Sequence, residues 1–175
     1  EMLKQVEELK TNPALSALEY LNPLAAALVG WTARHSVLAE FHGAEGKIRD
    51  SAGMANLWGA RESLSARLTQ AGFPISEDPQ FPPDALEESI DWLTTQRIPT
   101  FGHLGVGILH PRFLQNDARI AELYRRVSVS GGQISGEHGM GLKKRQWASE
   151  SFQADVQALK TQFDPYNIFN RGKQC

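Results

Sequence analysis

Two glycine-rich stretches of the sequence hold three of its five histidines. RIPTFGHLGVGILHPRF contains His103 and His110, and GGQISGEHGMGL contains Glu137 followed directly by His138. Two imidazoles and one carboxylate are a known ligand set for zinc or iron, and this set leaves coordination positions open for a substrate. His103, His110 and Glu137 are therefore candidate metal ligands.

The spacing of the two ligand histidines restricts how the chain can run between them. His103 and His110 are seven positions apart. On an unbroken strand they would point to opposite faces and stand about 23 Å apart. Ligand atoms on one cation lie much closer, because metal–nitrogen bonds are about 2 Å long. A shared cation therefore requires the chain to bulge or double back, which Gly105 and Gly107 permit because glycine accepts positive φ.

Structural explanations compete with these functional ones. An isolated histidine in a strand is more often a satisfied structural residue than a ligand, and we expect this of His35 and His42. The Gly-Val-Gly sequence at 105–107 is a weak candidate for a phosphate-binding loop. No Lys-Ser/Thr pair accompanies it and no helix obviously follows it. Composition alone leaves the choice between a structural and a metal-binding role open for the glycine-flanked histidines.

Length and charge limit the classes of protein to which the chain can belong. Its 175 residues are 41% hydrophobic, which suffices for one domain with a proper core. The 18 basic and 20 acidic residues give a net charge of -2. Nucleic acid is therefore a poor expected partner, since phosphate binding needs clustered positive charge. No apolar stretch is long enough for a transmembrane segment.

The termini suggest where the protein resides. The charged beginning EMLKQVEELK lacks the form of a secretory signal. The only cysteine is Cys175, so a disulfide or a cysteine-based zinc site within the chain is excluded. We expect a cytoplasmic protein, and peripheral attachment to the inner membrane stays open. The start without Met, within a helix, indicates a piece of a longer protein.

The hydrophobic pattern and the Pro and Gly positions predict mixed secondary structure. Helices are expected over residues 1–11, 14–21, 55–72, 83–96, 115–132 and 151–163. Strands are expected over 36–42, on both sides of a turn within 98–111, and briefly within 132–141; residues 43–53 should be loop and 73–83 extended. The chain lacks the Gly-x-Gly-x-x-Gly turn of a dinucleotide fold. We therefore expect an α+β fold, an antiparallel sheet with helices packed on one face.

Three motifs in order resemble a known family. GHLGVGILH, GGQISGEHGMGLKKR and FDPYNIFNRGK, supported by LWGARESL and LAEFHG, resemble the C-terminal substrate (cap) domain of FAD-linked oxidases. This group includes the D-lactate, glycolate and D-2-hydroxyglutarate dehydrogenases of the vanillyl-alcohol oxidase superfamily. The resemblance implies that residues 1–175 form one ferredoxin-like cap domain. The N-terminal FAD-binding domain of the family would then be absent from this chain.

The resemblance also implies roles for individual residues. His103, His110 and Glu137 match the positions that bind a divalent metal, which would be Zn, Fe or Mn. His138 matches the base. Arg61, in the Trp-x-x-Arg sequence, matches the arginine that holds the substrate carboxylate.

Three further positions have weaker counterparts in the family. Ser65 stands where a hydroxyl-bearing threonine often assists substrate binding. Asn170 and Lys173 match positions near the flavin. Structural roles compete at these positions: Ser65 could be a solvent-facing helix residue, and Asn170 could cap a helix end. A salt bridge with Glu62 or a neighbouring carboxylate is the structural alternative for Arg61.

The sequence departs from the family pattern at several positions. Val106 and Ile108 stand in place of Asp and Asn, Ser76 in place of a carboxylate-binding Lys, and Arg171 in place of Pro. The segment between Gly43 and Trp58 is shorter than in the family. These differences affect the expected substrate more than the expected fold.

The function implied by the resemblance is the substrate- and metal-binding half of an FAD-dependent oxidoreductase. The enzyme would oxidise a 2-hydroxy acid of the D-lactate or glycolate type by hydride transfer to the flavin. Its partners would be the acid substrate, an FAD-binding domain or subunit, and an electron acceptor that the sequence does not identify.

Three alternatives are open at this point. The chain could be a non-catalytic cap or subunit-interaction module with a drifted site, which Val106, Ile108 and Ser76 favour. A zinc hydrolase lacks support because the His-Glu-x-x-His motif is missing. The terminal sequence GKQC could also begin an iron–sulfur extension.

We predict that the isolated 175 residues bind no FAD tightly and turn over no substrate, because the chain has no glycine-rich nucleotide-binding segment. The measurement mixes the chain with FAD, D-lactate and a dye acceptor and follows dye reduction. Robust turnover would refute the prediction.

Overall fold

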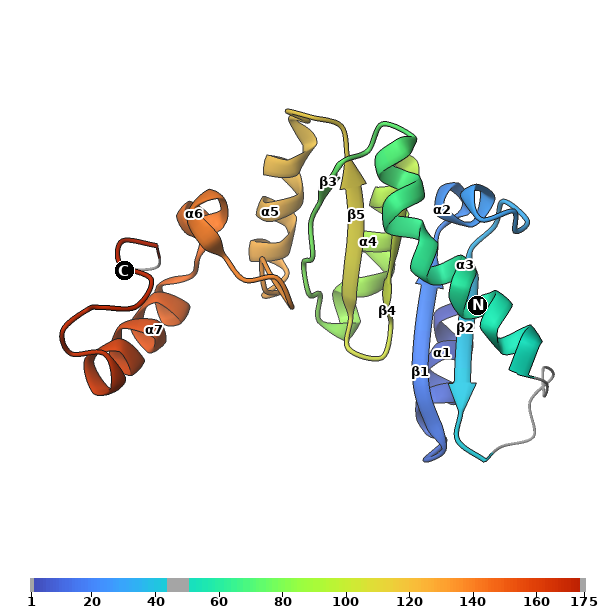
Figure 1. The fold of residues 1–175 in the computed structure, drawn as a ribbon, viewed down its shortest axis with the longest axis horizontal. Helices are drawn as coiled ribbons and strands as arrows, with labels where there is room; N and C mark the ends of the chain where they lie inside the picture. The colour runs from blue at the N-terminus through green and yellow to red at the C-terminus, as the bar shows by residue number, and fades with distance from the viewer. Residues whose placement is uncertain (1, 44–50, 174–175) are drawn as a thin grey trace.

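The protein is built on a five-stranded antiparallel sheet. A computed structural model describes residues 2–43 and 51–173. The strands are β1 (Leu15–Leu21), β2 (Ser36–Phe41), β3 (Ile75–Ser76), β4 (Thr100–His103) and β5 (Ile108–Phe113). Their order across the sheet is β2-β1-β4-β5-β3, and neighbouring strands run antiparallel (Figure 1). The expected α+β class with an antiparallel sheet is confirmed.

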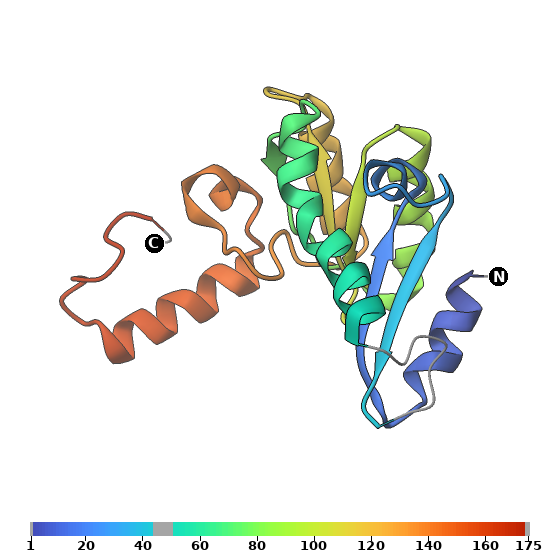
Figure 2. The same ribbon diagram turned by 45° about the vertical axis from the view of Figure 1, so that its right-hand side comes forward.

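Helices cover the sheet and continue beyond it. They are α1 (Met2–Lys10), α2 (Pro23–Leu28), α3 (Ser51–Gln70), α4 (Pro83–Thr95), α5 (Arg119–Val129), α6 (Gly141–Lys144) and α7 (Glu150–Phe163), with a 3-10 turn at Arg145–Trp147. Helices lie on both faces of the sheet and not on one face alone. On one face, α1, α4 and α5 pack against side chains such as Tyr20, Leu109 and Phe113. On the opposite face, α2 and α3 pack around Leu21 and Phe101 (Figures 1 and 2).

The helix expected over residues 14–21 is wrong, because residues 15–21 form β1. Leu18 and Tyr20 point to the face covered by α1, α4 and α5, whereas Glu19 and Leu21 belong to the face of α3. All four residues are buried. The helix propensity of Ala, Leu and Glu is overridden because β1 pairs with β2 on one side and with β4 on the other.

The Asn22-Pro23 pair begins a helix rather than ending one. Asn22 caps α2 by accepting a hydrogen bond from the backbone N of Ala25 at 3.0 Å, and Pro23 occupies the first helical turn. The same side chain accepts from the backbone N of Thr100 and donates to the carbonyl of Ile98. One buried amide thus joins the end of β1 to the start of β4.

Strands β4 and β5 form a hairpin whose turn comprises residues 104–107. In its register His103 lies opposite Ile108, and Phe101 lies opposite His110. Residues directly opposite each other share a face, so both histidines lie on the face of α3. The doubling back that a shared cation requires is therefore present.

Smaller differences separate the expected and observed elements. The short strand expected within 132–141 is wrong: Gln133 and Ser135 form isolated bridges with Gln80 and Asp78. Part of the loop expected over 43–53 belongs to α3, which begins at Ser51. Residues 44–50, in the segment that is shorter than in the family, lie outside the described residues, and so does Cys175. The other expected helices and strands are confirmed with small shifts at their ends.

The C-terminal arm, which comprises α7 and the residues after it (150–173), extends away from the sheet in both views (Figures 1 and 2). Helix α7 contains no buried residue. Several large apolar side chains of the arm are exposed, among them Phe163 and Tyr166. No helix among the described residues has both the length and the apolar character needed to cross a membrane.

We predict that Gly107→Ala destabilises the domain and that Gly105→Ala does not. Gly107 has a φ of +72°, and a Cβ there would come 2.4 Å from the carbonyl oxygen of Phe81. Left-handed strain and the clash together should lower the free energy of unfolding by about 2–4 kcal/mol. A Cβ on Gly105 would meet no atom within 4 Å. Urea unfolding measures both variants, and equal stabilities would contradict the prediction.

Candidate metal and substrate site

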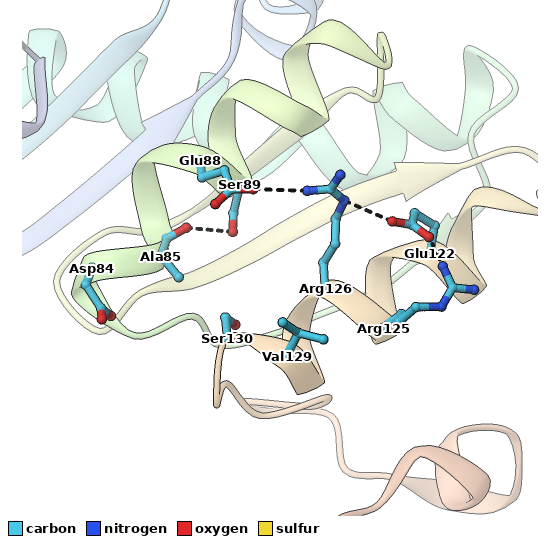
Figure 3. Close-up of a pocket in the computed structure, with 9 residues that line it drawn as sticks. All are labelled: Asp84, Ala85, Glu88, Ser89, Glu122, Arg125, Arg126, Val129 and Ser130. Carbon is cyan, nitrogen blue, oxygen red and sulfur yellow. Dashed lines mark hydrogen bonds and ion pairs between the residues drawn. The ribbon is translucent and has the colours of Figure 1, made fainter.

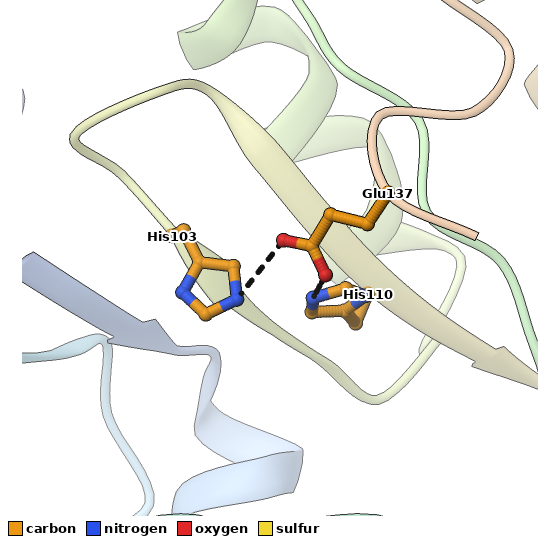
Figure 4. A group of neighbouring side chains, drawn as sticks. All are labelled: His103, His110 and Glu137. Carbon is orange, nitrogen blue, oxygen red and sulfur yellow. Dashed lines mark ion pairs between the residues drawn. The ribbon is translucent and has the colours of Figure 1, made fainter. Parts of the chain in front are cut away.

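The three candidate metal ligands converge on one point beside the sheet (Figure 4). His103 and His110 come from β4 and β5, and Glu137 comes from the segment after α5. Nε2 of His103 lies 3.3 Å from Oε1 of Glu137, and Nε2 of His110 lies 3.8 Å from Oε2. One ligand atom from each residue can be chosen so that all lie within 4.8 Å of one another. Small side-chain rotations would bring these atoms around a single cation.

His110 has the protonation state that a metal ligand needs. Its side chain is buried and faces the ring of Phe101 at 5.1 Å between centroids. Burial lowers the pKa of His110 to about 4. The imidazole is therefore neutral near pH 7 and keeps a lone pair for coordination.

A buried carboxylate orients the other histidine. Oε1 of Glu19 lies 2.6 Å from Nδ1 of His103, which leaves Nε2 of the same ring directed at Glu137. Ligating histidines commonly use their second nitrogen in this way. The hydrogen bond to Glu19 raises the pKa of His103. Burial alone would raise the pKa of Glu19, but the hydrogen bonds from His103 and Arg61 hold this pKa below its usual range.

Sequence reasoning missed Glu19 because the strand that carries it was expected to be a helix. On a surface helix a glutamate faces water. On β1 the same residue is 5% exposed and lies directly opposite His103. The usable signal was a single carboxylate among apolar residues in ALSALEYL.

Arg61 projects from α3 to the same carboxylate. Its Nε donates to Oε2 of Glu19 at 2.7 Å, and its guanidinium carbon lies 4.7 Å from the centre of the Phe101 ring. Among the described residues Arg61 forms no hydrogen bond through its two terminal nitrogens. Arg61 thus makes a salt bridge, which was the structural alternative to a substrate-binding role, but its partner is Glu19, a residue distant in sequence. The bond through Nε leaves the two terminal nitrogens of the guanidinium available for an anion.

His138 lies at the exposed side of the cluster. Its ring stacks on that of His110, with centroids 5.6 Å apart, and its side chain is 53% exposed. Its Nε2 is 4.0 Å from Oε2 of Glu137. A solvent-accessible imidazole beside the three candidate ligands is placed to exchange a proton with a bound molecule.

Comparison with known proteins places the chain in a family. Residues 25–174 match the family described as FAD linked oxidases, C-terminal domain. The chain belongs to this family.

Named relatives of the FAD-linked oxidase domain act on hydroxy acids. The chain is 36% identical over 94 residues to a D-lactate dehydrogenase of Anaerostipes hadrus, covering 45% of this chain and 20% of the relative. It is 36% identical over 90 residues to glycolate oxidase subunit GlcD of Bacillus subtilis, covering 43% and 19%. It is 32% identical over 144 residues to a D-2-hydroxyglutarate dehydrogenase of Stutzerimonas stutzeri, covering 69% and 31%. The matched regions thus span at most about a third of these relatives.

Other residues matched to the FAD-linked oxidase pattern lie outside the cluster. The hydroxyl of Ser65 accepts a hydrogen bond from Arg112 at 3.0 Å, which gives this serine a structural partner. Asn170 and Lys173 lie in the C-terminal arm, where the backbone N of Lys173 donates to the carbonyl of Asn170. Both residues are exposed.

The departures from the family pattern have different environments. Val106 is exposed in the hairpin turn. Ile108 is buried beside His110 and lies under Gly136, where an added Cβ would come 2.7 Å from its Cδ1. Ser76 pairs with Arg112 at the β3 edge. Ile108 therefore makes the floor of the candidate site apolar next to His110.

A separate depression lies between α4 and α5, on the other face of the sheet (Figure 3). Arg126 pairs there with Glu88 and Glu122, and Arg125 also pairs with Glu122. These charges neutralise each other. The depression contains none of the residues singled out from the sequence.

We predict strong coupling between Glu19 and Arg61. A double-mutant cycle with Glu19→Gln and Arg61→Met should give a coupling free energy of roughly 1–3 kcal/mol, because each single change leaves a buried polar group with a lost partner. The exposed pair Glu7 and Lys10 is the control, and its coupling should stay below about 0.5 kcal/mol. Urea unfolding provides all values, and equal couplings would contradict the prediction.

Proposed function

We propose that this domain is the substrate- and metal-binding half of an FAD-dependent enzyme that oxidises a 2-hydroxy acid. The supporting observation is the convergence of His103, His110 and Glu137 within 4.8 Å, next to an arginine whose terminal nitrogens are available. The donor set of two imidazoles and one carboxylate suits Zn, Fe or Mn. The names of the relatives support a substrate of the D-lactate, glycolate or D-2-hydroxyglutarate type.

Each residue of the site has a separate role in binding or oxidising such a substrate. Arg61 holds the substrate carboxylate through its terminal nitrogens and thereby fixes the orientation of the adjacent carbon. His138 accepts the proton of the 2-hydroxyl group. His103, His110 and Glu137 would hold the cation, which would supply Lewis-acid stabilisation of the charge on the hydroxyl oxygen. FAD, when bound, supplies the acceptor for the hydride from C2.

The proposed partner is an FAD-binding domain. Asn170 and Lys173 are exposed, as contact with a cofactor held by another domain requires. The exposed apolar side chains of α7 and the residues after it, such as Phe163 and Tyr166, suit burial against such a domain. Ser65 supports substrate binding in this proposal by fixing α3, which carries Arg61.

An alternative function is a non-catalytic cap with a drifted site. The apolar Ile108 beside His110 favours it, because a polar residue stands at this position in the family pattern. Such a module would hold no stoichiometric cation and would not respond to changes at the ligands.

We predict that His110→Ala in the full-length protein removes one divalent cation per chain. Oxidation of the preferred 2-hydroxy acid should fall by at least about 100-fold, because a bound cation contributes several kcal/mol of charge stabilisation. The control is His42→Ala, which changes an exposed histidine outside the cluster. Elemental analysis and steady-state assays with D-lactate, glycolate and D-2-hydroxyglutarate measure both effects. A wild-type protein without cation or turnover would favour the non-catalytic cap.

A further inference from the structure

The ligand loop, residues 135–138, carries Glu137 and His138 but belongs to no helix or strand. The geometry of the ligand loop depends on Asp78, which lies in the segment that runs between β5 and this loop. Each of its four residues donates a hydrogen bond to Asp78. The donors are the hydroxyl of Ser135 and the backbone N of Gly136, Glu137 and His138, at 2.7, 2.8, 2.8 and 2.7 Å.

Three of these bonds end on the same carboxylate oxygen. Oδ2 of Asp78 accepts from Ser135, Glu137 and His138, while the carbonyl of Asp78 accepts from Gly136. The side chain of Asp78 is 0% exposed. Hydrogen bonds to a buried charge are stronger than neutral ones, so this anchor restrains the loop more than a backbone bridge would.

The second carboxylate oxygen of Asp78 forms an ion pair with a buried lysine. Nζ of Lys144 lies 2.5 Å from Oδ1 of Asp78 and 3.0 Å from Oε2 of Glu77. Glu77 in turn accepts a hydrogen bond from the hydroxyl of Tyr124 at 2.6 Å. Asp78 therefore has a buried countercharge and cannot rotate away from the loop without breaking that pair.

We propose that Asp78 is a positioning residue that sets the place of Glu137 and His138 relative to the two histidines of the hairpin. The inference rests on the proposed function, in which Glu137 binds a cation. Ligand sites tolerate displacements of only about 0.5 Å, so a loop without secondary structure needs such an anchor. The neighbouring Glu77 lies in the same buried network but, among the described residues, forms no hydrogen bond or ion pair with the ligand loop.

The test compares Asp78→Asn with Glu77→Gln in the full-length protein. Each change removes one carboxylate charge beside Lys144 and keeps the size of the side chain. Only the first puts an amide NH2 group against a donor, either Lys144 or the N–H groups of the loop. Two readouts are used: hydrogen–deuterium exchange of the amides of residues 137 and 138, and Zn²⁺ affinity by chelator competition.

Asp78→Asn should speed exchange of these two amides and weaken Zn²⁺ binding by about 10–100-fold, the usual effect of losing an outer partner of a ligand. Glu77→Gln should lower the thermal stability while leaving loop exchange and Zn²⁺ affinity unchanged. Ser135→Ala removes one hydrogen bond and keeps the charge, so it should act in the same direction more weakly and provides the test if Asp78→Asn does not fold.

Two results would overturn the inference: unchanged exchange of residues 137 and 138 in Asp78→Asn, or equal losses of Zn²⁺ affinity in Asp78→Asn and Glu77→Gln. A wild-type protein that binds no Zn²⁺ would instead overturn the proposed metal function. The exchange rates alone would then decide whether Asp78 holds the loop.

Discussion

The pairing register of the β4–β5 hairpin is the constraint on which the site depends. It sets Phe101 opposite His110 and His103 opposite Ile108, so two histidines an odd number of residues apart share one face. A turn with one residue more or fewer would change which side chains oppose each other. One imidazole would then point to the opposite face of the sheet, which α1, α4 and α5 cover. Gly107, whose positive φ brings the chain against the carbonyl of Phe81, fixes this turn.

Two buried carboxylates complete the arrangement from opposite sides. Glu19 joins the ring of His103 to the guanidinium of Arg61, and so links the candidate cation site to the candidate anion site. Asp78 gathers the backbone that presents Glu137. Both carboxylates are held in the charged form by hydrogen bonds that outweigh burial: the pKa of Glu19 lies below its usual range and that of Asp78 is lowered to about 2.

The sequence predicted the clustering of the three candidate ligands better than the residues that hold them in place. His103, His110 and Glu137 were recognisable because histidines flanked by glycines are uncommon, and most helices followed from their apolar period. The strand β1 was not predictable in the same way, since ALSALEYL has strong helix formers and becomes a strand only through its neighbours. Glu19 was missed with it. Asp78 gave no signal, because an acidic residue in a proline-rich segment is ordinarily solvated.

The short segment around residues 78–80 has a consequence for how such domains can diverge. On one edge it bonds to β5, where Gln80 bridges Ile108 and the backbone N of Leu109 donates to Pro79; on the other, Asp78 and Gln80 bridge Ser135 and Gln133. An insertion or deletion here would shift the segment that carries Glu137 relative to β5, which carries His110, by about 3.3 Å per residue. Length variation in this lineage should therefore be confined to places such as the exposed hairpin tip and the C-terminal arm, while residues 78–80 keep their number even when their identities change.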